Sequence, residues 1–342
     1  MAIKDVDIKK RQYARPYIRR ARYVIQWYIV AAVLIGGVSL NSFYRSLLAG
    51  ADPSFTKPLS VEGFMPIGAL MSLKLWLASG LFDPVHPAAL VLFISALLLA
   101  TALKKGFCGW ICPVGTISES IWKLGKRVFG RNFKAPSYID IPLRSLKYIL
   151  MTFFLYVILI KMSPVSIRSF LFTPYWKVAD FKLLMFFTEM SMTTLIVLAS
   201  LFSLSLLYRN FWCRYLCPYG ALLGLLSMLS PLKVTRNNDN CIHCGTCSKV
   251  CPSHLPVESK VRLRTPECIG CASCVSRCPS EGALELALPR GRVVRPYLHI
   301  ALISIIFFGS ILVAMASGHW KSNVTVEEYR RILPVISSLQ HP

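Results

Sequence analysis

The 12 cysteines of this chain fall into four short motifs, and their spacing indicates metal chemistry. Two motifs share the pattern C-x2-C-x2-C-x3-C-P, in which three thiolates hold one [4Fe–4S] cluster and the fourth reaches a neighbouring cluster. The pattern therefore predicts two clusters with exchanged fourth ligands. Cluster 1 is expected to use Cys241, Cys244, Cys247 and Cys278. Cluster 2 is expected to use Cys268, Cys271, Cys274 and Cys251.

Zinc binding and disulfide formation fit this pattern less well. Zinc sites use one or two C-x2-C pairs per metal rather than a doubled run of four cysteines ending in proline. Disulfide bonds are disfavoured in the reducing cytosol, where the charge distribution described below places these residues. The two runs therefore predict a bacterial-type 2[4Fe–4S] ferredoxin module of α+β structure over residues 234–290.

The other four cysteines form an internal repeat. They lie in "GFCGWICPVG" (Gly106–Gly115) and "NFWCRYLCPYG" (Asn210–Gly220), each a C-x3-C-P motif that follows a long apolar run. Three uses remain open: a third iron–sulfur or other metal site, redox-active dithiols that capture a metal such as copper, and buried structural thiols. The metal-site hypothesis uses all four residues, Cys108, Cys112, Cys213 and Cys217.

Apolar runs near the length of a membrane crossing dominate the rest of the chain, which is 54% hydrophobic. They predict an α-helical membrane protein with about five transmembrane helices, at Val24–Leu40, Ala88–Leu103, Leu146–Met162, Leu183–Tyr208 and Tyr297–Ser317. Outside these spans, 29 of the 39 Lys and Arg residues lie on one side of the membrane. Because basic loops remain cytoplasmic, we expect the N-terminus, both C-x3-C motifs and the ferredoxin module in the cytoplasm.

These boundaries give five segments. Residues 1–22 form a basic cytoplasmic arm, and residues 23–233 form a membrane domain with four spans and both C-x3-C motifs. The ferredoxin module at 234–290 follows, then a fifth helix at 291–317 and an extracytoplasmic tail at 318–342. The net charge of +23 is explained by the cytoplasmic loops, so no nucleic-acid partner is expected.

Charges inside apolar stretches mark less regular parts of the membrane domain. Phe64–Phe82 carries Lys74 near its centre, so this stretch is predicted to be re-entrant or to lie on the membrane surface. Lys147, at the end of the third span, is expected to extend to the interface. Glu189 lies inside the fourth apolar run and is the candidate for a quinone site. The structural alternatives are a position near the interface, pairing with Lys182, or capping of a helix.

Together, "CGWICPVG", "CRYLCPYG" and the two ferredoxin runs resemble the membrane polyferredoxins, a family with NapH-like, NosR-like and CcoG/FixG-like members. The resemblance covers about residues 88–290. It is closest to the compact NapH-like quinol dehydrogenase subunits, because only short segments flank the first and last predicted spans. The resemblance implies electron transfer at the level of quinones.

The expected function is an electron-transfer subunit of an oxidoreductase complex in the bacterial inner membrane. It would relay electrons between the quinone pool and a redox partner protein through cytoplasmic [4Fe–4S] clusters. Expected cofactors are two such clusters, with a third cluster or metal and quinone as further candidates. Expected partners are membrane lipid, quinone and an electron-transfer protein. Two alternatives are a factor that reduces copper for assembly of a respiratory enzyme, and a redox-sensing membrane regulator.

Overall fold

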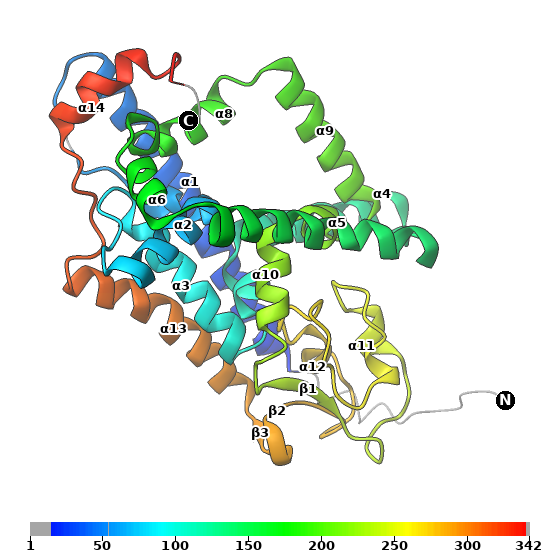
Figure 1. Cartoon of the computed structure of the whole chain (residues 1–342). Coiled ribbons are helices and arrows are strands. Elements are labelled where there is room, and N and C mark those ends of the chain that lie inside the picture. The colour runs from blue at the N-terminus through cyan, green and yellow to red at the C-terminus, as the bar shows by residue number, and fades with distance from the viewer. Residues whose placement is uncertain (1–14, 54, 340–342) are drawn as a thin grey trace. The chain divides into compact units, whose positions relative to one another are not determined.

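The computed structural model describes residues 15–53 and 55–339, so most of the predicted N-terminal arm lies outside the described residues. The chain divides into two compact units. Unit 1 comprises Met1–Ile29, Ala96–Tyr148 and Phe202–Ile306, and unit 2 comprises Val30–Ser95, Ile149–Leu201 and Phe307–Pro342. Their boundaries fall inside five helices (Figure 1), which are α1 (Pro16–Leu48), α3 (Pro87–Ala102), α5 (Ser137–Leu155), α9 (Met192–Leu207) and α13 (Pro296–Ala316).

Unit 1 contains the ferredoxin module, which is built from short elements (Figure 1). An antiparallel sheet of order β1-β2-β3 pairs Val234 with Leu286 and Leu286 with Val294. These three apolar side chains are buried, so one face of the sheet packs inward. The module's elements are β1 (Lys233–Arg236), α11 (Thr246–Lys249), η6 (Val257–Ser259), α12 (Ser273–Ser276), β2 (Leu284–Ala287), η7 (Pro289–Gly291) and β3 (Val293–Val294).

The rest of unit 1 contains the two C-x3-C motifs, and each is followed by a helix. The elements are the π-helical turn η3 (Phe107–Ile111), α4 (Pro113–Phe129), the π-helical turn η5 (Trp212–Leu216) and α10 (Pro218–Leu226). Proline at the first position of α4 and α10 suits a helix start, because the missing N–H would have no partner there. Gly125 of α4 lies against the Leu206 backbone, where a Cβ atom would collide.

Within its described residues, the regular secondary structure of unit 2 is helical. Its elements are η2 (Ser60–Phe64), α2 (Pro66–Ser79), η4 (Tyr156–Lys161), α6 (Pro164–Leu171), α7 (Pro174–Lys177), α8 (Ala179–Thr188), α14 (Val326–Ile332) and η8 (Leu333–Val335). One apolar core joins Leu40 and Phe43 to Phe181 and Tyr329. A second core joins Met71 and Leu75 of α2 to residues of α6, α7 and η4.

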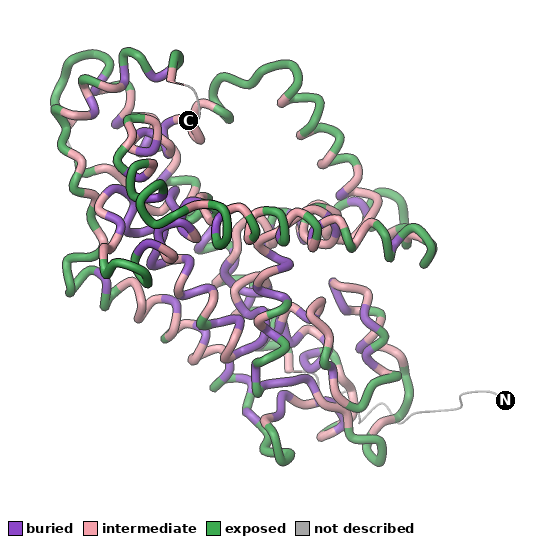
Figure 2. The backbone as a smooth tube through the Cα atoms, viewed as in Figure 1, coloured by how far each residue is buried: buried purple, intermediate pink, exposed green. Residues whose placement is uncertain are grey.

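Among the described residues, three helices have the length and hydropathy of a membrane span: α1, α13 and the continuous stretch Ser137–Lys161 formed by α5 and η4. Their apolar surfaces, with those of α9, include many exposed residues (Figure 2), such as Phe153, Ile196 and Leu312. The second predicted span corresponds to α3, which has 16 residues and falls short of a full crossing.

The fourth predicted span, Leu183–Tyr208, is not one helix as the sequence analysis assumed. It consists of α8 and α9, which are bent by 78° at the intervening break. Glu189, Met190 and Ser191 occupy this break, and Ser191 caps α9 by accepting a hydrogen bond from the Thr194 N–H. A Ser N-cap favours a new helix start here over continuation of the old helix.

Two lysines in apolar stretches have partners that the sequence did not reveal. Lys74 of α2 donates to the carbonyl oxygens of Ile158 and Leu159 at 3.0 Å each. It therefore satisfies backbone groups at the end of η4. Lys147 is buried and donates to Glu267 at 2.7 and 2.8 Å.

Candidate metal centres

The two ferredoxin runs adopt the same backbone turns. In each run, the residues before and after the second cysteine have positive φ: His243 and Gly245 in the first, Gly270 and Ala272 in the second. Left-handed conformations at these positions wrap the chain tightly, so successive thiols can face one centre. Because His243 and Ala272 adopt them without being glycine, the turn is imposed by the surroundings rather than by local preference.

The fourth cysteine of each run lies with the other run. Cys251 lines one cavity together with Cys268, Cys271 and Cys274. Burial raises the pKa of Cys251 to about 12, and the Cys271 thiol adds to this effect. Burial likewise raises the pKa of Cys278, and the thiols of Cys244, Cys247 and Cys241 raise it further. The structure thus places Cys251 beside the second run and Cys278 near the first, which is the exchange on which the predicted ligand sets depend.

The two C-x3-C motifs fold in the same way. Each motif lies on a π-helical turn closed by an i→i+5 hydrogen bond, from the Cys112 N–H to the Phe107 oxygen at 2.9 Å and from the Cys217 N–H to the Trp212 oxygen at 3.0 Å. Each second cysteine is extended and precedes the first turn of α4 or α10. In the second motif, the Gly220 N–H donates to the Cys217 sulfur at 3.2 Å.

All four thiols of the repeat lie close enough to influence one another. Burial raises the pKa of Cys213, and the thiols of Cys217, Cys112 and Cys108 raise it further. Burial also raises the pKa of Cys108 to about 11 and that of Cys112 to about 12. Metal binding would therefore have to release protons from these thiols.

The spacing of these thiols is wider than a single tetrahedral ion requires. Such an ion, with metal–sulfur bonds near 2.3 Å, holds its thiolates about 3.8 Å apart. Among the described residues, the one group of three or more candidate ligands within 4.8 Å of one another contains no cysteine. No three of these thiols therefore lie as close together as a single tetrahedral ion requires.

Both C-x3-C motifs pack against the ligand loops of the predicted cluster 2. The indole N–H of Trp110 donates to the Gly270 oxygen at 3.1 Å, and a Cβ atom on Gly109 would collide with the Ile269 oxygen. The second motif reaches the loop after Cys251. There Asn210 donates to the Pro252 oxygen at 3.3 Å, and Arg214 donates to the Ser253 oxygen at 2.8 Å.

Residues that the sequence analysis missed hold this contact in place. Arg22 and Gln26 of α1 donate to the Gly109 oxygen at 2.7 and 3.2 Å, and Arg22 also pairs with Glu119 of α4. His299 of α13 packs edge-on against Trp110 and lies 3.1 Å from the Gly270 oxygen. These are single polar residues in long helices, and only their position in the fold identifies them.

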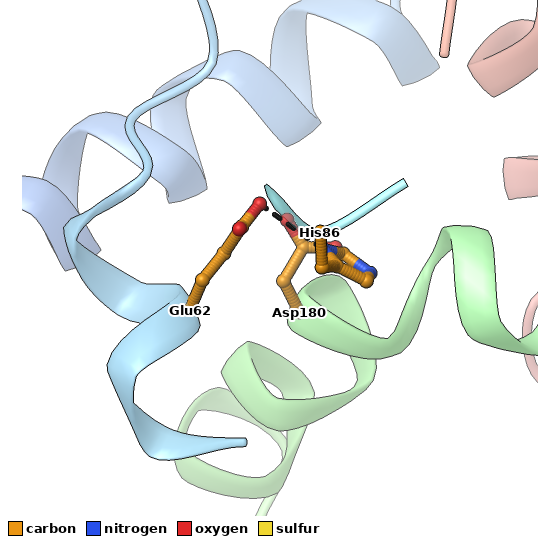
Figure 3. Close-up of side chains that lie close together, drawn as sticks. All are labelled: Glu62, His86 and Asp180. Carbon is orange, nitrogen blue, oxygen red and sulfur yellow. Dashed lines mark hydrogen bonds and ion pairs between the residues drawn. The ribbon is translucent and has the colours of Figure 1, made fainter. Parts of the chain in front are cut away.

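Unit 2 contains a buried ion cluster that was also unexpected. Figure 3 shows Glu62, His86 and Asp180 converging from η2, the segment before α3, and α8. The Lys57 ammonium lies 2.8 Å from Asp180 and 3.4 Å from Glu62. Because this ammonium already neutralises the carboxylates, we assign the cluster to ion pairing rather than to metal binding.

The imidazole of His86 completes this ion cluster. Its Nδ1 lies 3.0 Å from a Glu62 oxygen and its Nε2 lies 2.8 Å from the Trp176 carbonyl oxygen. Since both neighbours are acceptors, only the doubly protonated ring donates to both. Burial alone would lower the pKa of His86, but the Glu62 carboxylate outweighs burial and raises it. Two carboxylates are thus balanced by two cations.

Glu189 is not a member of this ion cluster. It is exposed and ends α8, next to the exposed side chains of Phe186, Phe187 and Met190. Lys182, its suggested partner, instead donates to the Leu339 carbonyl oxygen. Among the described residues, Glu189 therefore does not form the suggested salt bridge with Lys182.

Comparisons with known proteins agree with this geometry. Residues 85–132 and 190–237, which contain the C-x3-C motifs, match the family model of a 4Fe-4S binding domain. Residues 233–279 match that of a 4Fe-4S dicluster domain. YccM of Escherichia coli (strain K12), whose name proposes electron transport, is 43% identical over 299 residues, which cover 86% of this chain and 84% of YccM.

Two further relatives carry ferredoxin-type names. The methylamine utilization ferredoxin-type protein MauN of Methylobacillus flagellatus is 26% identical over 256 residues, covering 72% of this chain and 79% of MauN. The ferredoxin-type protein NapH of Escherichia coli (strain K12) is 32% identical over 184 residues, covering 54% of this chain and 59% of NapH. No solved structure gives a significant match.

The long apolar helices and the grouped thiols define a membrane protein that binds iron–sulfur clusters and transfers electrons. The relatives make the assignment more specific. The chain belongs to the family of NapH-like membrane polyferredoxins, which includes YccM and MauN.

The buried ion cluster predicts how stability depends on pH. Because the pKa of folded His86 lies above its ordinary value of 6.5, its contribution is present below about pH 6.5 and is lost as the pH rises through the raised pKa. His86→Gln should lower the free energy of unfolding by about 3–5 kcal/mol at pH 6 and flatten this dependence. Thermal unfolding in detergent between pH 6 and 9 measures both effects. Exposed His319 provides the control, His319→Gln, and equal profiles for the two variants would contradict the assignment.

Proposed function

We propose that this protein holds three [4Fe–4S] clusters and relays electrons between the quinone pool and a redox partner protein. The packing of both C-x3-C motifs on the ligand loops of cluster 2 is the observation that carries this proposal. Redox groups exchange electrons efficiently when the protein holds them close together. The proposed order is therefore the C-x3-C centre, then cluster 2, then cluster 1.

The proposed ligands follow the observed groups of thiols. Each bound cluster supplies reversible one-electron chemistry. Cluster 1 is assigned to Cys241, Cys244, Cys247 and Cys278. Cluster 2 is assigned to Cys268, Cys271, Cys274 and Cys251. The third cluster is assigned to Cys108, Cys112, Cys213 and Cys217.

Three observations support a third cluster over a dithiol pair or a copper site. The four thiols are spread more widely than one ion requires. The two segments that carry them match a 4Fe-4S family model. Lys105 is buried beside them, and no carboxylate among the described residues lies within 4 Å of its ammonium, which favours an anionic group at this site.

The alternation of the chain between its two units supports the proposed five spans and their orientation. Each unit boundary falls inside one of the five predicted spans. Unit 1 holds every segment predicted to be cytoplasmic, including the ferredoxin module and both C-x3-C motifs. We therefore propose that the ferredoxin module and both C-x3-C motifs face the cytoplasm, that the C-terminal tail lies outside, and that the protein resides in the bacterial inner membrane.

Glu189 is the proposed group for proton transfer from quinol. Oxidation of a quinol releases two protons with its two electrons, so a base must lie within reach. The Glu189 carboxylate is exposed at the α8–α9 break, and the exposed side chains of Phe186, Phe187 and Met190 offer an apolar surface for the quinone ring and tail. An ionisable group within an apolar segment is a functional candidate on general grounds.

The third cluster is tested by counting iron and sulfide in anaerobically purified protein. We expect about twelve iron atoms per chain, and about eight in Cys108→Ser/Cys217→Ser, because one four-iron centre is lost. The ferredoxin clusters should remain in the variant. About eight iron atoms in both proteins would contradict a third cluster.

The quinone relay is tested in proteoliposomes with a reduced quinol. We expect quinol to bleach the visible absorbance of the clusters in the intact protein, and Glu189→Gln to slow this bleaching at least tenfold while reduction by dithionite is unchanged. Glu327→Gln is the matched control, because Glu327 is an exposed glutamate of α14. Equal rates for Glu189→Gln and Glu327→Gln would rule out the Glu189 assignment. No bleaching by quinol in any protein would rule out the relay.

A further inference from the structure

Two adjacent buried lysines connect α3 to the first C-x3-C motif. Lys104 is 2% exposed and Lys105 is 4% exposed. A buried ammonium is costly unless a negative charge lies close by, so each lysine requires a specific partner. Within the described residues neither lysine forms a salt bridge with a carboxylate, although buried Lys147 nearby is fully paired with Glu267.

Lys105 faces the C-x3-C thiols. A Cβ atom placed on Gly220 or on Gly224 of α10 would lie 3.6 Å from the Lys105 ammonium, and the Gly220 position is also 3.4 Å from the Cys217 sulfur. The absence of a side chain at both glycines gives the ammonium room beside Cys217. Burial raises the pKa of Cys108 and of Cys213, and the charge of Lys105 counteracts part of this rise. Glu267 feels the same charge, but it is already bound to Lys147.

Lys104 faces the other centre. Its ammonium donates to the Thr265 carbonyl oxygen at 3.2 Å, and the charge of Cys268 counteracts part of the lowering of the Lys104 pKa by burial. Its Cβ atom lies beside Gly270, in the same ligand loop. Lys233 and Arg262 add positive charge there.

The backbone at Lys104 accounts for this divergence. Lys104 has φ of +63°, a left-handed conformation that is unfavourable for a residue with a Cβ atom. A hydrogen bond of 2.9 Å from the Lys104 N–H to the Ser230 hydroxyl holds this turn. Consecutive side chains therefore leave the backbone toward two different centres. Strain of this kind persists where the surrounding structure enforces it, and commonly at functional sites.

We propose that Lys105 is the counter-cation of the C-x3-C centre and Lys104 that of cluster 2, so that the two lysines set the reduction potentials of neighbouring centres separately. This inference rests on the proposed third cluster. Each reduction adds one electron and one negative charge to a centre, and a fixed ammonium in a low-dielectric site stabilises that charge. The ammonium groups thus make both centres easier to reduce.

The test is an anaerobic redox titration followed by EPR, with iron measured in the same samples. Cys108→Ser and Cys251→Ser identify the signals of the C-x3-C centre and of cluster 2 by their loss. Lys105→Met should shift only the C-x3-C centre to a more negative potential. Lys104→Met should shift only cluster 2, by a smaller amount because Lys233 and Arg262 remain. Lys126→Met, at an exposed lysine of α4, should shift neither.

Lys105→Arg keeps the positive charge and so separates the effect of charge from that of structural support. Its C-x3-C centre should retain the reduction potential that it has in the unmodified protein. If Lys105→Met loses four iron atoms, retention of iron in Lys105→Arg supports the charge role, and loss in both variants overturns it. Unshifted potentials in Lys105→Met with about twelve iron atoms present overturn the counter-cation assignment alone. About eight iron atoms in the unmodified protein, with no signal lost in Cys108→Ser, would refute the third cluster itself.

Discussion

The close approach of Gly109 to the Ile269 carbonyl oxygen joins the first C-x3-C motif to a ligand loop of the second ferredoxin run, and no side chain fits there. The surrounding residues maintain this approach. Arg22 and Gln26 hold the Gly109 oxygen, and Trp110 holds the Gly270 oxygen. Since the second motif binds the loop after Cys251, both C-x3-C motifs converge on the group of thiols that includes Cys251.

Charge is distributed differently in the two units. Unit 2 balances its buried cations, Lys57 and His86, with the carboxylates of Glu62 and Asp180, so that it needs no external ion. Unit 1 buries Lys104 and Lys105 beside thiols without a carboxylate salt bridge among the described residues. An anionic cluster with thiolate ligands, as proposed for the C-x3-C centre, would supply the charge that such a site lacks.

The cysteine groups could be predicted from spacing because their chemistry is local: three ligands within seven residues must share one centre. The repeat of the C-x3-C motif and its position after apolar runs also anticipated the convergence of those thiols. By contrast, the ion cluster depends on Lys57 and Asp180, which are far apart in the chain and carry no local pattern. The break at Glu189 was missed because the apolar runs on either side of the short stretch Thr188–Thr194 were joined into one predicted span. The family resemblance indicated from sequence is confirmed by YccM and NapH.

The proposed relay requires the C-x3-C centre to be adjacent to cluster 2. Magnetic coupling in the fully reduced protein tests this most directly. Pulsed EPR of the C-x3-C centre should show relaxation enhancement by its neighbour. This enhancement should disappear in Cys251→Ser, because the variant lacks a ligand that the first run contributes to cluster 2. It should persist in Cys278→Ser, which removes cluster 1 through a residue of the second run. Enhancement that survives Cys251→Ser and disappears in Cys278→Ser would contradict both the order of the centres and the exchange of their ligands.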